Sequence, residues 1–317
     1  MRILVTGGAG FIGSNYIHLL LRSRKDIEVI NLDKLSYAGN LANLRDIEKD
    51  PRYRFIKGDI CDAKIVDQAM QGCDEVLNFA AETHVDRSIT GPEAFVRTDV
   101  LGTFTLLEAA KRHKVSRFVQ ISTDEVYGSV EKGSFKEDDP LQPNSPYSAS
   151  KAGADMLVRA YHHTYGLPTL ITRSSNNYGP YQYPEKIIPL FITNLLCGKK
   201  VPLYGDGKNV RDWLYVEDNC EGIELVRTKG SPGMVYNIAS GHELPNIELT
   251  TTVLKELGMD SKAIEYVKDR PGHDRRYSLD IGRMRALGFK PRHGFAEDIK
   301  NTVQWYKQHE SWWRSLL

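Results

Sequence analysis

The sequence predicts an α/β fold: a doubly wound parallel sheet with helices on both faces, followed by a smaller mixed α/β domain. Short apolar, β-branched runs alternate with helical stretches through the first half of the chain, as is typical of parallel sheets. A glycine-rich turn joins the first of these runs to the first helix. Beyond residue 175 the alternation loosens into loops rich in tyrosine, proline and glycine. We therefore expect one domain over 1–175 and a second over 176–317, with segments near 211–238 returning to the first.

The composition argues against several classes of protein. The 42 Lys and Arg residues nearly balance the 41 Asp and Glu residues, so no overall field favours nucleic acid or a membrane surface. No apolar run approaches the length that crosses a bilayer, and the N-terminus opens directly into a predicted strand, so we expect no signal peptide. The four cysteines lack metal-binding spacing, which predicts reduced thiols in a cytoplasmic protein and no metal site.

The glycine turn has the context of a dinucleotide-binding motif. Residues 2–6 form a β-rich strand, Gly7-x-x-Gly10-x-x-Gly13 follows at once, and apolar residues recur at helical spacing over 14–24. Glycines let the backbone approach a pyrophosphate closely, and the free N–H groups of a helix N-terminus attract its charge. Strand, glycine turn and helix together predict a Rossmann-type domain.

An acid at the end of the second strand indicates which dinucleotide binds. The strand over 28–32 ends in Asp33, twenty residues after Gly13. A carboxylate there accepts hydrogen bonds from an adenosine ribose and repels a 2′-phosphate. Lys34 follows and offsets part of that repulsion, and NAD is still predicted over NADP. The alternation then continues through two further strands and a helix, at 53–56, 75–79 and 92–113.

The strand over 118–121 carries four polar residues, Ser122-Thr123-Asp124-Glu125, to the carboxyl edge of the sheet, where open α/β sheets bind ligands. On its own this segment also fits a solvated turn with a helix cap. Tyr147 and Lys151 favour a catalytic interpretation, because they stand four apart in a helix predicted over 146–161 and share one face. A lysine beside a phenol lowers the pKa of the phenol and makes it a usable base, although such pairs also occur on helix surfaces.

Together these motifs resemble the extended short-chain dehydrogenase/reductase family. Within it, residues 122–128, Ser-Thr-Asp-Glu-Val-Tyr-Gly, are similar to those of the dTDP-glucose 4,6-dehydratases. The similarity runs essentially end to end and includes further stretches at 81–88, 176–181, 185–190 and 270–274. The Thr-Asp-Glu and Arg-Pro-Gly-His elements are its most discriminating parts.

Two adjacent carboxyl groups match the chemistry of such an enzyme. A tyrosine base and a nicotinamide suffice to oxidise a sugar hydroxyl at C4, but elimination of water also needs a base at C5 and an acid at O6. Close like charges help one carboxyl to stay protonated, and the residues alone do not say which. The resemblance implies Glu125 as the C5 base, Asp124 as the acid and Tyr147 as the C4 base, assisted by Lys151 and Thr123. It implies that NADH returns the hydride to C6, giving dTDP-4-keto-6-deoxyglucose for deoxysugar biosynthesis of the rhamnose type.

The resemblance also implies binding residues and a homodimer paired through the helices at 92–113 and 147–165. For NAD these residues are Gly7, Gly10, Phe11, Ile12, Gly13, Asp33, Lys34, Leu35, Ser36, Asp59, Ile60, Phe79, Ala80, Ala81, Thr98, Ser122, Tyr147, Lys151 and Asn177. For the nucleotide-sugar they are Thr83, His84, Thr123, Asn176, Lys186, Ile187, Pro202, Tyr204, Arg211, Asn246, Arg270 and His273. An aromatic cluster near the C-terminus is expected to pack a final helix instead: Trp305, Tyr306, Trp312 and Trp313.

Two other functions remain open at this point. A nucleotide-sugar 4-epimerase or decarboxylase of the same fold shares the cofactor site and the Tyr/Lys pair, but usually carries small or hydroxyl residues where Asp124 and Glu125 stand. A non-catalytic binding scaffold is the second alternative. Two observations argue against a scaffold: the catalytic residues Thr123, Tyr147 and Lys151 are intact, and the chain has no excess of basic residues that would bind nucleic acid.

Overall fold

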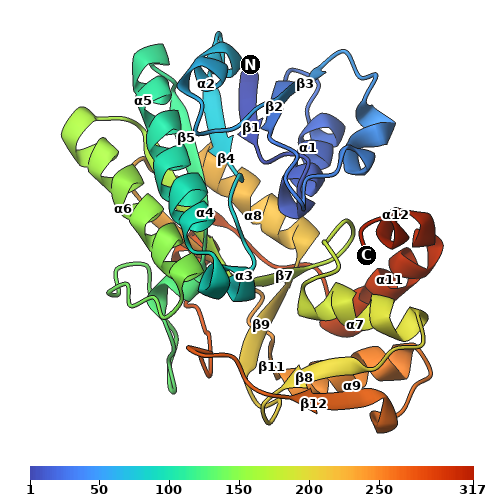
Figure 1. Cartoon of the computed structure of the whole chain (residues 1–317). Helices are drawn as coiled ribbons and strands as arrows, with labels where there is room; N and C mark the ends of the chain where they lie inside the picture. The colour runs from blue at the N-terminus through green and yellow to red at the C-terminus, as the bar shows by residue number, and fades with distance from the viewer.

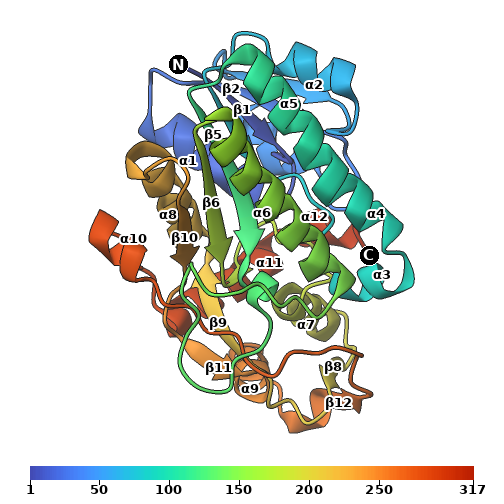
Figure 2. The same ribbon diagram turned by 90° about the vertical axis from the view of Figure 1, so that its left-hand side faces the viewer.

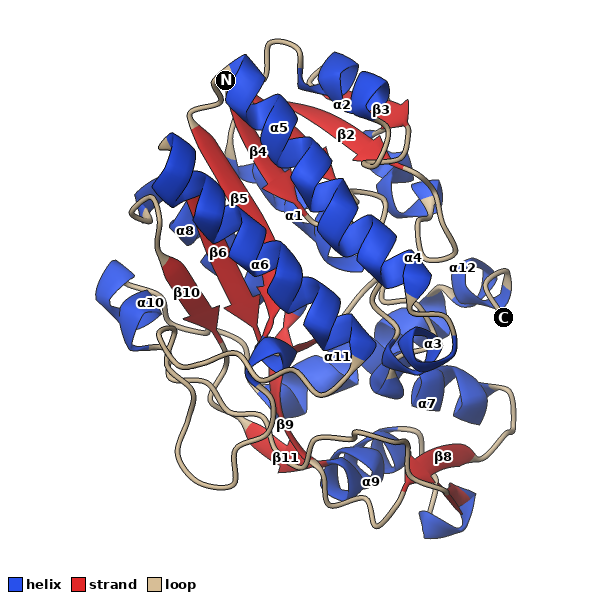
Figure 3. Ribbon diagram, turned by 60° about the vertical axis from the view of Figure 1, so that its left-hand side comes forward, coloured by secondary structure: helices blue, strands red, loops and turns tan.

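A seven-stranded parallel sheet forms the centre of the structure, a computed structural model that describes residues 1–317. Its strands lie in the order β10-β6-β5-β4-β1-β2-β3, and every neighbouring pair is parallel (Figures 1 and 3). The strand order reverses between β1 and β4, so the carboxyl ends of these strands border a crevice. The strands are β1 Arg2–Thr6, β2 Glu28–Asp33, β3 Tyr53–Lys57, β4 Glu75–Asn78, β5 Arg117–Thr123, β6 Thr169–Ser174 and β10 Val235–Ile238.

Helices cover both faces of this sheet, each over its own hydrophobic core, which confirms the predicted doubly wound fold. α1 and α8 pack on one face, and α2, α5 and α6 pack on the other. Figure 3 shows α5 and α6 side by side across the sheet. None of the helices is both long enough and apolar enough to cross a membrane. These elements are α1 Phe11–Ser23, the 3-10 helix η1 Leu41–Ile47, α2 Ala63–Met70, α5 Thr103–His113, α6 Pro146–Tyr165 and α8 Val216–Lys229.

The helix predicted over 92–113 is present but changes its winding midway. After α3 Val85–Thr90, α4 Glu93–Phe95 leads into a π-helical segment, η2 Val96–Gly102, and then into α5. Such π segments often lie at functional sites. Here the segment carries Asp99, whose carboxylate accepts hydrogen bonds from the Glu82 N–H at 2.9 Å and the Ser150 hydroxyl at 2.6 Å.

Two small sheets, four α-helices and one short 3-10 helix form the second part of the chain, below the large sheet in Figure 1. β9 pairs with β7 and β11, and β8 pairs with β12. Trp313 and Tyr306 are fully buried in the core of this part, so the C-terminal aromatic cluster packs the final helices as predicted. The elements are β7 Asn176–Tyr178, α7 Ile187–Leu196, β8 Val201–Tyr204, β9 Val210–Tyr215, β11 Glu243–Pro245, α9 Asn246–Glu256, η4 Ser261–Ala263, β12 Ile264–Val267, α11 Phe295–Gln308 and α12 Glu310–Arg314.

The two parts interleave in the sequence. α8 and β10 return to the large sheet, and α10 Gly282–Leu287 packs beside them (Figure 2). β9 stays in the three-stranded sheet with β7 and β11. The returning segment therefore begins at Val216, with α8, rather than near residue 211.

Candidate active site

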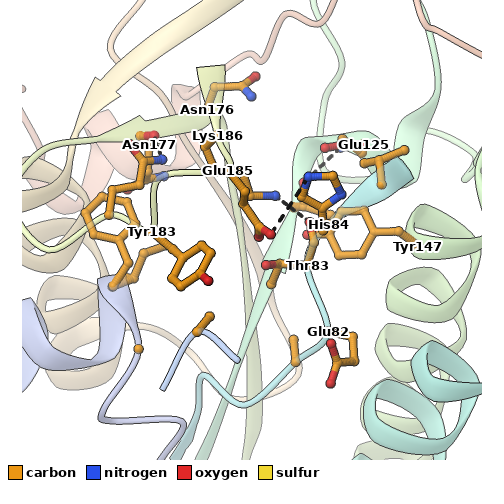
Figure 4. Close-up of a pocket in the computed structure, with 18 of the residues that line it drawn as sticks. Glu82, Thr83, His84, Glu125, Tyr147, Asn176, Asn177, Tyr183, Glu185 and Lys186 are labelled. Carbon is orange, nitrogen blue, oxygen red and sulfur yellow. Dashed lines mark hydrogen bonds and ion pairs between the residues drawn. The ribbon is translucent and has the colours of Figure 1, made fainter. Parts of the chain in front are cut away.

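A large cleft runs along the carboxyl edge of the seven-stranded sheet and into the second part of the chain. It extends from the glycine turn after β1, past the end of β5, to Arg270 and His273. Every residue predicted to act in catalysis or binding lines this cleft, with the exception of Leu35. Figure 4 shows its middle, where His84, Lys186 and Tyr147 come together from three different segments.

The glycine turn forms a cradle that larger residues would fill. Gly7 has φ +67°, and a Cβ there would lie 2.6 Å from the Ala80 nitrogen. A Cβ on Gly13 would lie 2.4 Å from the Gly7 carbonyl oxygen. α1 then begins with Gly10 as its N-cap and no side chain capping it, so its first N–H groups are free to meet a phosphate. This geometry fits a dinucleotide pyrophosphate.

Asp33 ends β2 and is held by backbone donors. Its Oδ2 accepts the Ala9 N–H at 2.9 Å, and its Oδ1 accepts the Leu35 N–H at 2.8 Å. Burial raises the pKa of this carboxyl, and both N–H groups oppose that rise. Lys34 instead pairs with Asp59 at 2.8 Å, so its charge is already matched and Asp33 remains an acceptor for ribose hydroxyls. Leu35, predicted to touch the cofactor, does not line the cleft; its left-handed φ of 55° turns its N–H back to Asp33.

The two acids after β5 do not form a solvated turn. β5 ends at Thr123, and a short 3-10 helix, η3 Asp124–Tyr127, follows inside the protein. The Thr123 hydroxyl donates to Asp124 at 3.2 Å and accepts the Glu125 N–H at 3.2 Å. Asp124 is buried, and its Oδ2 has no hydrogen-bond partner.

Asp124 and Glu125 differ in their electrostatic surroundings. Burial, and then the charge of Glu125, raise the pKa of Asp124 well above its ordinary range. Burial also raises the pKa of Glu125, but three cations, Arg270, Lys186 and Arg211, oppose that rise. Asp124 is therefore the better proton donor and Glu125 the better base.

Tyr147 and Lys151 lie in the first turns of α6 and both line the cleft. The Lys151 ammonium donates to the Ile121 carbonyl at 2.7 Å. Burial, followed by the charges of Glu125 and Asp99, raises the pKa of Tyr147, and hydrogen bonding with Thr123 opposes the rise. Lys151 is not among the main influences on this pKa, because its ammonium donates to a backbone carbonyl and burial dominates the phenol; the lowering of the pKa of Tyr147 by Lys151 stays a prediction.

The far side of the cleft carries the predicted cations. Lys186 donates to the Thr83 carbonyl at 2.5 Å, beside the pair formed by His84 and Glu185 at 3.8 Å (Figure 4). Arg270 pairs with Asp86 at 3.6 Å. The remaining predicted residues border the same region: Asn176, Ile187, Pro202, Tyr204, Arg211, Asn246 and His273.

Four acids at the cleft escaped the sequence analysis, and one of them is Glu185, the partner of His84. Glu82 and Asp86 also line the cleft, and both lie in the 81–88 stretch that carries the family resemblance. Asp99 is buried behind it; burial raises its pKa to about 6, although the charge of Lys151 opposes the rise. The one sequence signal for Asp99 is its spacing: it stands four residues after Phe95, on the inward face of a predicted helix.

The fold and the cleft define a class of protein, the NAD-dependent short-chain dehydrogenases/reductases. A family model described as GDP-mannose 4,6 dehydratase matches residues 4–302. The dTDP-glucose 4,6-dehydratase of Streptomyces antibioticus is 57% identical over 322 residues, covering 100% of this chain and 95% of the relative. The chain belongs to this family of nucleotide-sugar 4,6-dehydratases, and within it to the dTDP-glucose 4,6-dehydratases.

Solved structures agree with this assignment. DesIV, a dTDP-glucose 4,6-dehydratase from Streptomyces venezuelae with NAD and dTDP bound, is 54% identical and superposes with a TM-score of 0.98 over 100% of both chains. A Thermus thermophilus UDP-glucose 4-epimerase in complex with NAD is 32% identical, with a TM-score of 0.89 over 98% of this chain and 100% of the epimerase. The predicted family and NAD cofactor are confirmed. The epimerase alternative shares the fold at lower identity.

Proposed function

We propose that the chain converts dTDP-glucose to dTDP-4-keto-6-deoxyglucose and water. The observation that carries this proposal is the pair of acids, Asp124 and Glu125, in the same cleft as Tyr147. Oxidation alone needs no such pair, whereas elimination of water across C5 and C6 needs an acid and a base. Bound NAD supplies the redox chemistry, by accepting a hydride from C4 and returning it to C6, so that none is consumed.

Tyr147 is the proposed base for the first proton transfer. It removes the proton of the C4 hydroxyl, and the hydroxyl of Thr123 helps to hold the phenol oxygen in place. Lys151 lies one helical turn further along α6 and brings a positive charge to the same face. Positive charge stabilises a phenolate, so we propose that Lys151 assists this step once its ammonium turns toward the cleft.

Elimination follows from the difference between the two acids. A ketone at C4 acidifies the C5 hydrogen, which Glu125 removes as the base. Asp124 donates its proton to the departing C6 hydroxyl. Its raised pKa favours the protonated form that an acid needs, while the cations around Glu125 favour the ionised form of the base. After water has left, a proton returns to C5.

The cations on the far side of the cleft are the proposed diphosphate ligands. Arg211, Arg270 and Lys186 bring positive charge, and guanidinium groups bind phosphates through paired hydrogen bonds. Asn176 and Asn246 line the same region, and their side-chain amide N–H groups are proposed to donate hydrogen bonds to the nucleotide-sugar. His273 is a further candidate for the diphosphate, and Pro202 to Tyr204 are proposed to border the base.

We also propose that two copies pair through η2, α5 and α6, whose contacts with each other form one surface. Large apolar side chains are exposed along it, including Val96 at 56%, Phe104 at 42% and Met156 at 45%. A monomer rarely leaves such side chains grouped in water. Light scattering of the purified chain tests this, and a monomer at micromolar concentration would contradict it.

The cellular setting is a further part of the proposal. A 4-keto-6-deoxy sugar nucleotide is a precursor for deoxysugars, so we propose a role in deoxysugar biosynthesis of the rhamnose type. The four cysteines are all free. This supports a reducing compartment such as the cytoplasm.

Incubation of the purified chain with dTDP-glucose tests the proposed reaction. We expect a product lighter by one water, with the ultraviolet absorbance that 4-keto sugars develop in alkali, and no need for repeated addition of NAD. Parallel incubations with UDP-, CDP- and GDP-glucose measure the base preference. Formation of an epimer of unchanged mass would instead support the 4-epimerase alternative.

A further inference from the structure

A buried guanidinium lies directly behind the end of β5. Arg173 stands in β6, where its backbone pairs with Ser122, next to Thr123. Its side chain is 3% exposed. It donates from Nε to Asp155 at 2.9 Å and from Nη1 to the hydroxyl of Tyr127 at 2.8 Å. The proposed reaction gives none of these three residues a role.

One arm of this cluster reaches the elimination acids. Tyr127 is the last residue of η3, the short turn that also holds Asp124 and Glu125. Its hydroxyl donates onward to Asn237 at 2.8 Å, and its ring stacks on Phe135 with the centroids 5.0 Å apart. Because η3 spans only four residues, we expect a shift of Tyr127 to move both acids.

The other arm reaches the residues of the redox step. Asp155 lies in α6, one turn beyond Lys151 and two turns beyond Tyr147, on the same face of the helix. It is fully buried. Arg173 therefore joins, through one planar group, the turn that carries the elimination acids and the helix that carries the redox residues.

We propose that Arg173 and Tyr127 are positioning residues that hold the η3 acids at a fixed distance from Tyr147 and Lys151. Apolar side chains of similar volume would hold these elements at least as firmly, because a buried charge costs solvation energy. What a guanidinium adds is direction, since its donors lie in a rigid plane. The inference rests on the proposed function, in which one substrate must meet both groups of residues in turn.

The expected consequence is selective. A misplacement of about 1 Å in a reacting group costs on the order of 100-fold in rate. Loss of the Tyr127 arm loosens η3 while Asp155 still holds α6, so elimination should slow more than oxidation. Loss of the Asp155 arm should have the opposite effect, because α6 is then released and η3 stays anchored.

The test uses the full-length, NAD-loaded protein with the substitution Tyr127→Phe. Single turnovers of dTDP-glucose are quenched, and two species are then distinguished by mass: the oxidised 4-keto sugar that still carries its C6 hydroxyl, and the dehydrated product. We expect the oxidised, undehydrated species to accumulate at least tenfold above its level in the unsubstituted protein, with KM nearly unchanged. Tyr161→Phe is the matched control, because it also removes a tyrosine hydroxyl bond, here to Glu108 at 2.6 Å, away from the cleft.

Thermal unfolding of each variant separates positioning from folding. If Tyr127→Phe lowers the unfolding temperature but leaves the ratio of the two species as in the unsubstituted protein, the positioning role is wrong. Asp155→Asn is the second test variant. We expect it to slow the oxidation step, and a slowed elimination step instead would contradict the inference. Absence of any dehydrated product from the unsubstituted protein would overturn the proposed function itself, which keeps the two failures distinct.

Discussion

Replacement of Glu125 by glutamine is the most informative single change in the cleft. The amide keeps the size of the side chain but cannot accept the C5 proton, so elimination loses its base. Asp124 is a poor substitute, because burial, the largest cause of its raised pKa, remains in this variant and opposes its ionised form. Glu125→Gln should therefore still bind NAD and dTDP-glucose, still oxidise C4, and release little 4-keto-6-deoxy product.

The size of the effect follows from the charges around the pair. A general base typically contributes about 10²–10⁴-fold, or roughly 3–5 kcal/mol of barrier. The charge of Glu125 is also the second cause of the raised pKa of Asp124, so its removal lets that pKa fall and leaves less of Asp124 protonated to act as the donor. Both partners of the elimination are impaired, and we expect a loss in the upper part of that range, about 10³–10⁴-fold.

The assay follows product release and the pH dependence of turnover. In the unsubstituted protein turnover should fall at low pH as Glu125 becomes protonated, with a midpoint above the ordinary value of a glutamate, 4.5. It should fall at high pH as Asp124 loses its proton. Residual turnover of Glu125→Gln should lack the low-pH limb. Glu108→Gln, on α5 outside the cleft, is the control. Turnover of Glu125→Gln within tenfold of the unsubstituted protein would refute the reasoning.

Three further changes have defined outcomes. Asp99 has a pKa of about 6 in the folded protein against an ordinary value of 3.8, so the folded state binds this proton more tightly than the unfolded state. The free energy of unfolding therefore falls by up to about 3 kcal/mol as the pH rises through that window. Asp99→Asn should remove this fall. Denaturant titrations at pH 4 and pH 8, about two pH units either side of the shifted pKa, measure the free energy of unfolding. If its difference between the two pH values is the same in Asp99→Asn as in the unsubstituted protein, the reasoning is contradicted. Gly13→Ala should weaken NAD binding at least tenfold by calorimetry, because its Cβ would lie 2.4 Å from the Gly7 oxygen; Gly294→Ala, where a Cβ meets open space, is the control. Arg270→Met should raise KM for dTDP-glucose by about 10–100-fold, the cost of a charged hydrogen bond, with NAD affinity kept; an equal loss of NAD affinity would argue against a diphosphate role.

The parts of the site that the sequence predicts are those in which local chain geometry decides position. The glycine turn, Asp33 and the residues after β5 each follow a strand of a parallel sheet, and such strands bring their carboxyl ends to one edge. Tyr147 and Lys151 share a face because their spacing is four. Their common position in the cleft follows from these two rules.

The rest depends on burial and on partners distant in the chain. The direction of the Lys151 ammonium, bound to the Ile121 carbonyl, cannot be derived from the spacing of Tyr147 and Lys151. The raised pKa of Asp99 comes from its burial in a π segment that periodicity does not reveal. Arg173 meets Tyr127 across 46 positions of sequence, so no local pattern links them. The resemblance implies contact of Leu35 with the cofactor; in the structure its left-handed backbone turns its N–H back to Asp33 and the residue does not line the cleft, so that contact stays a prediction.

Conversion of dTDP-glucose in deuterated water tests the central claim most directly. Elimination through Glu125 and Asp124 removes the C5 hydrogen and later restores a proton from the protein or solvent, so the account predicts a 4-keto-6-deoxy product that carries deuterium at C5. A product with solvent deuterium at C5 in the unsubstituted protein, and strongly reduced in Glu125→Gln, would match it. A C4 epimer that retains its C6 hydroxyl and contains no solvent deuterium would contradict it.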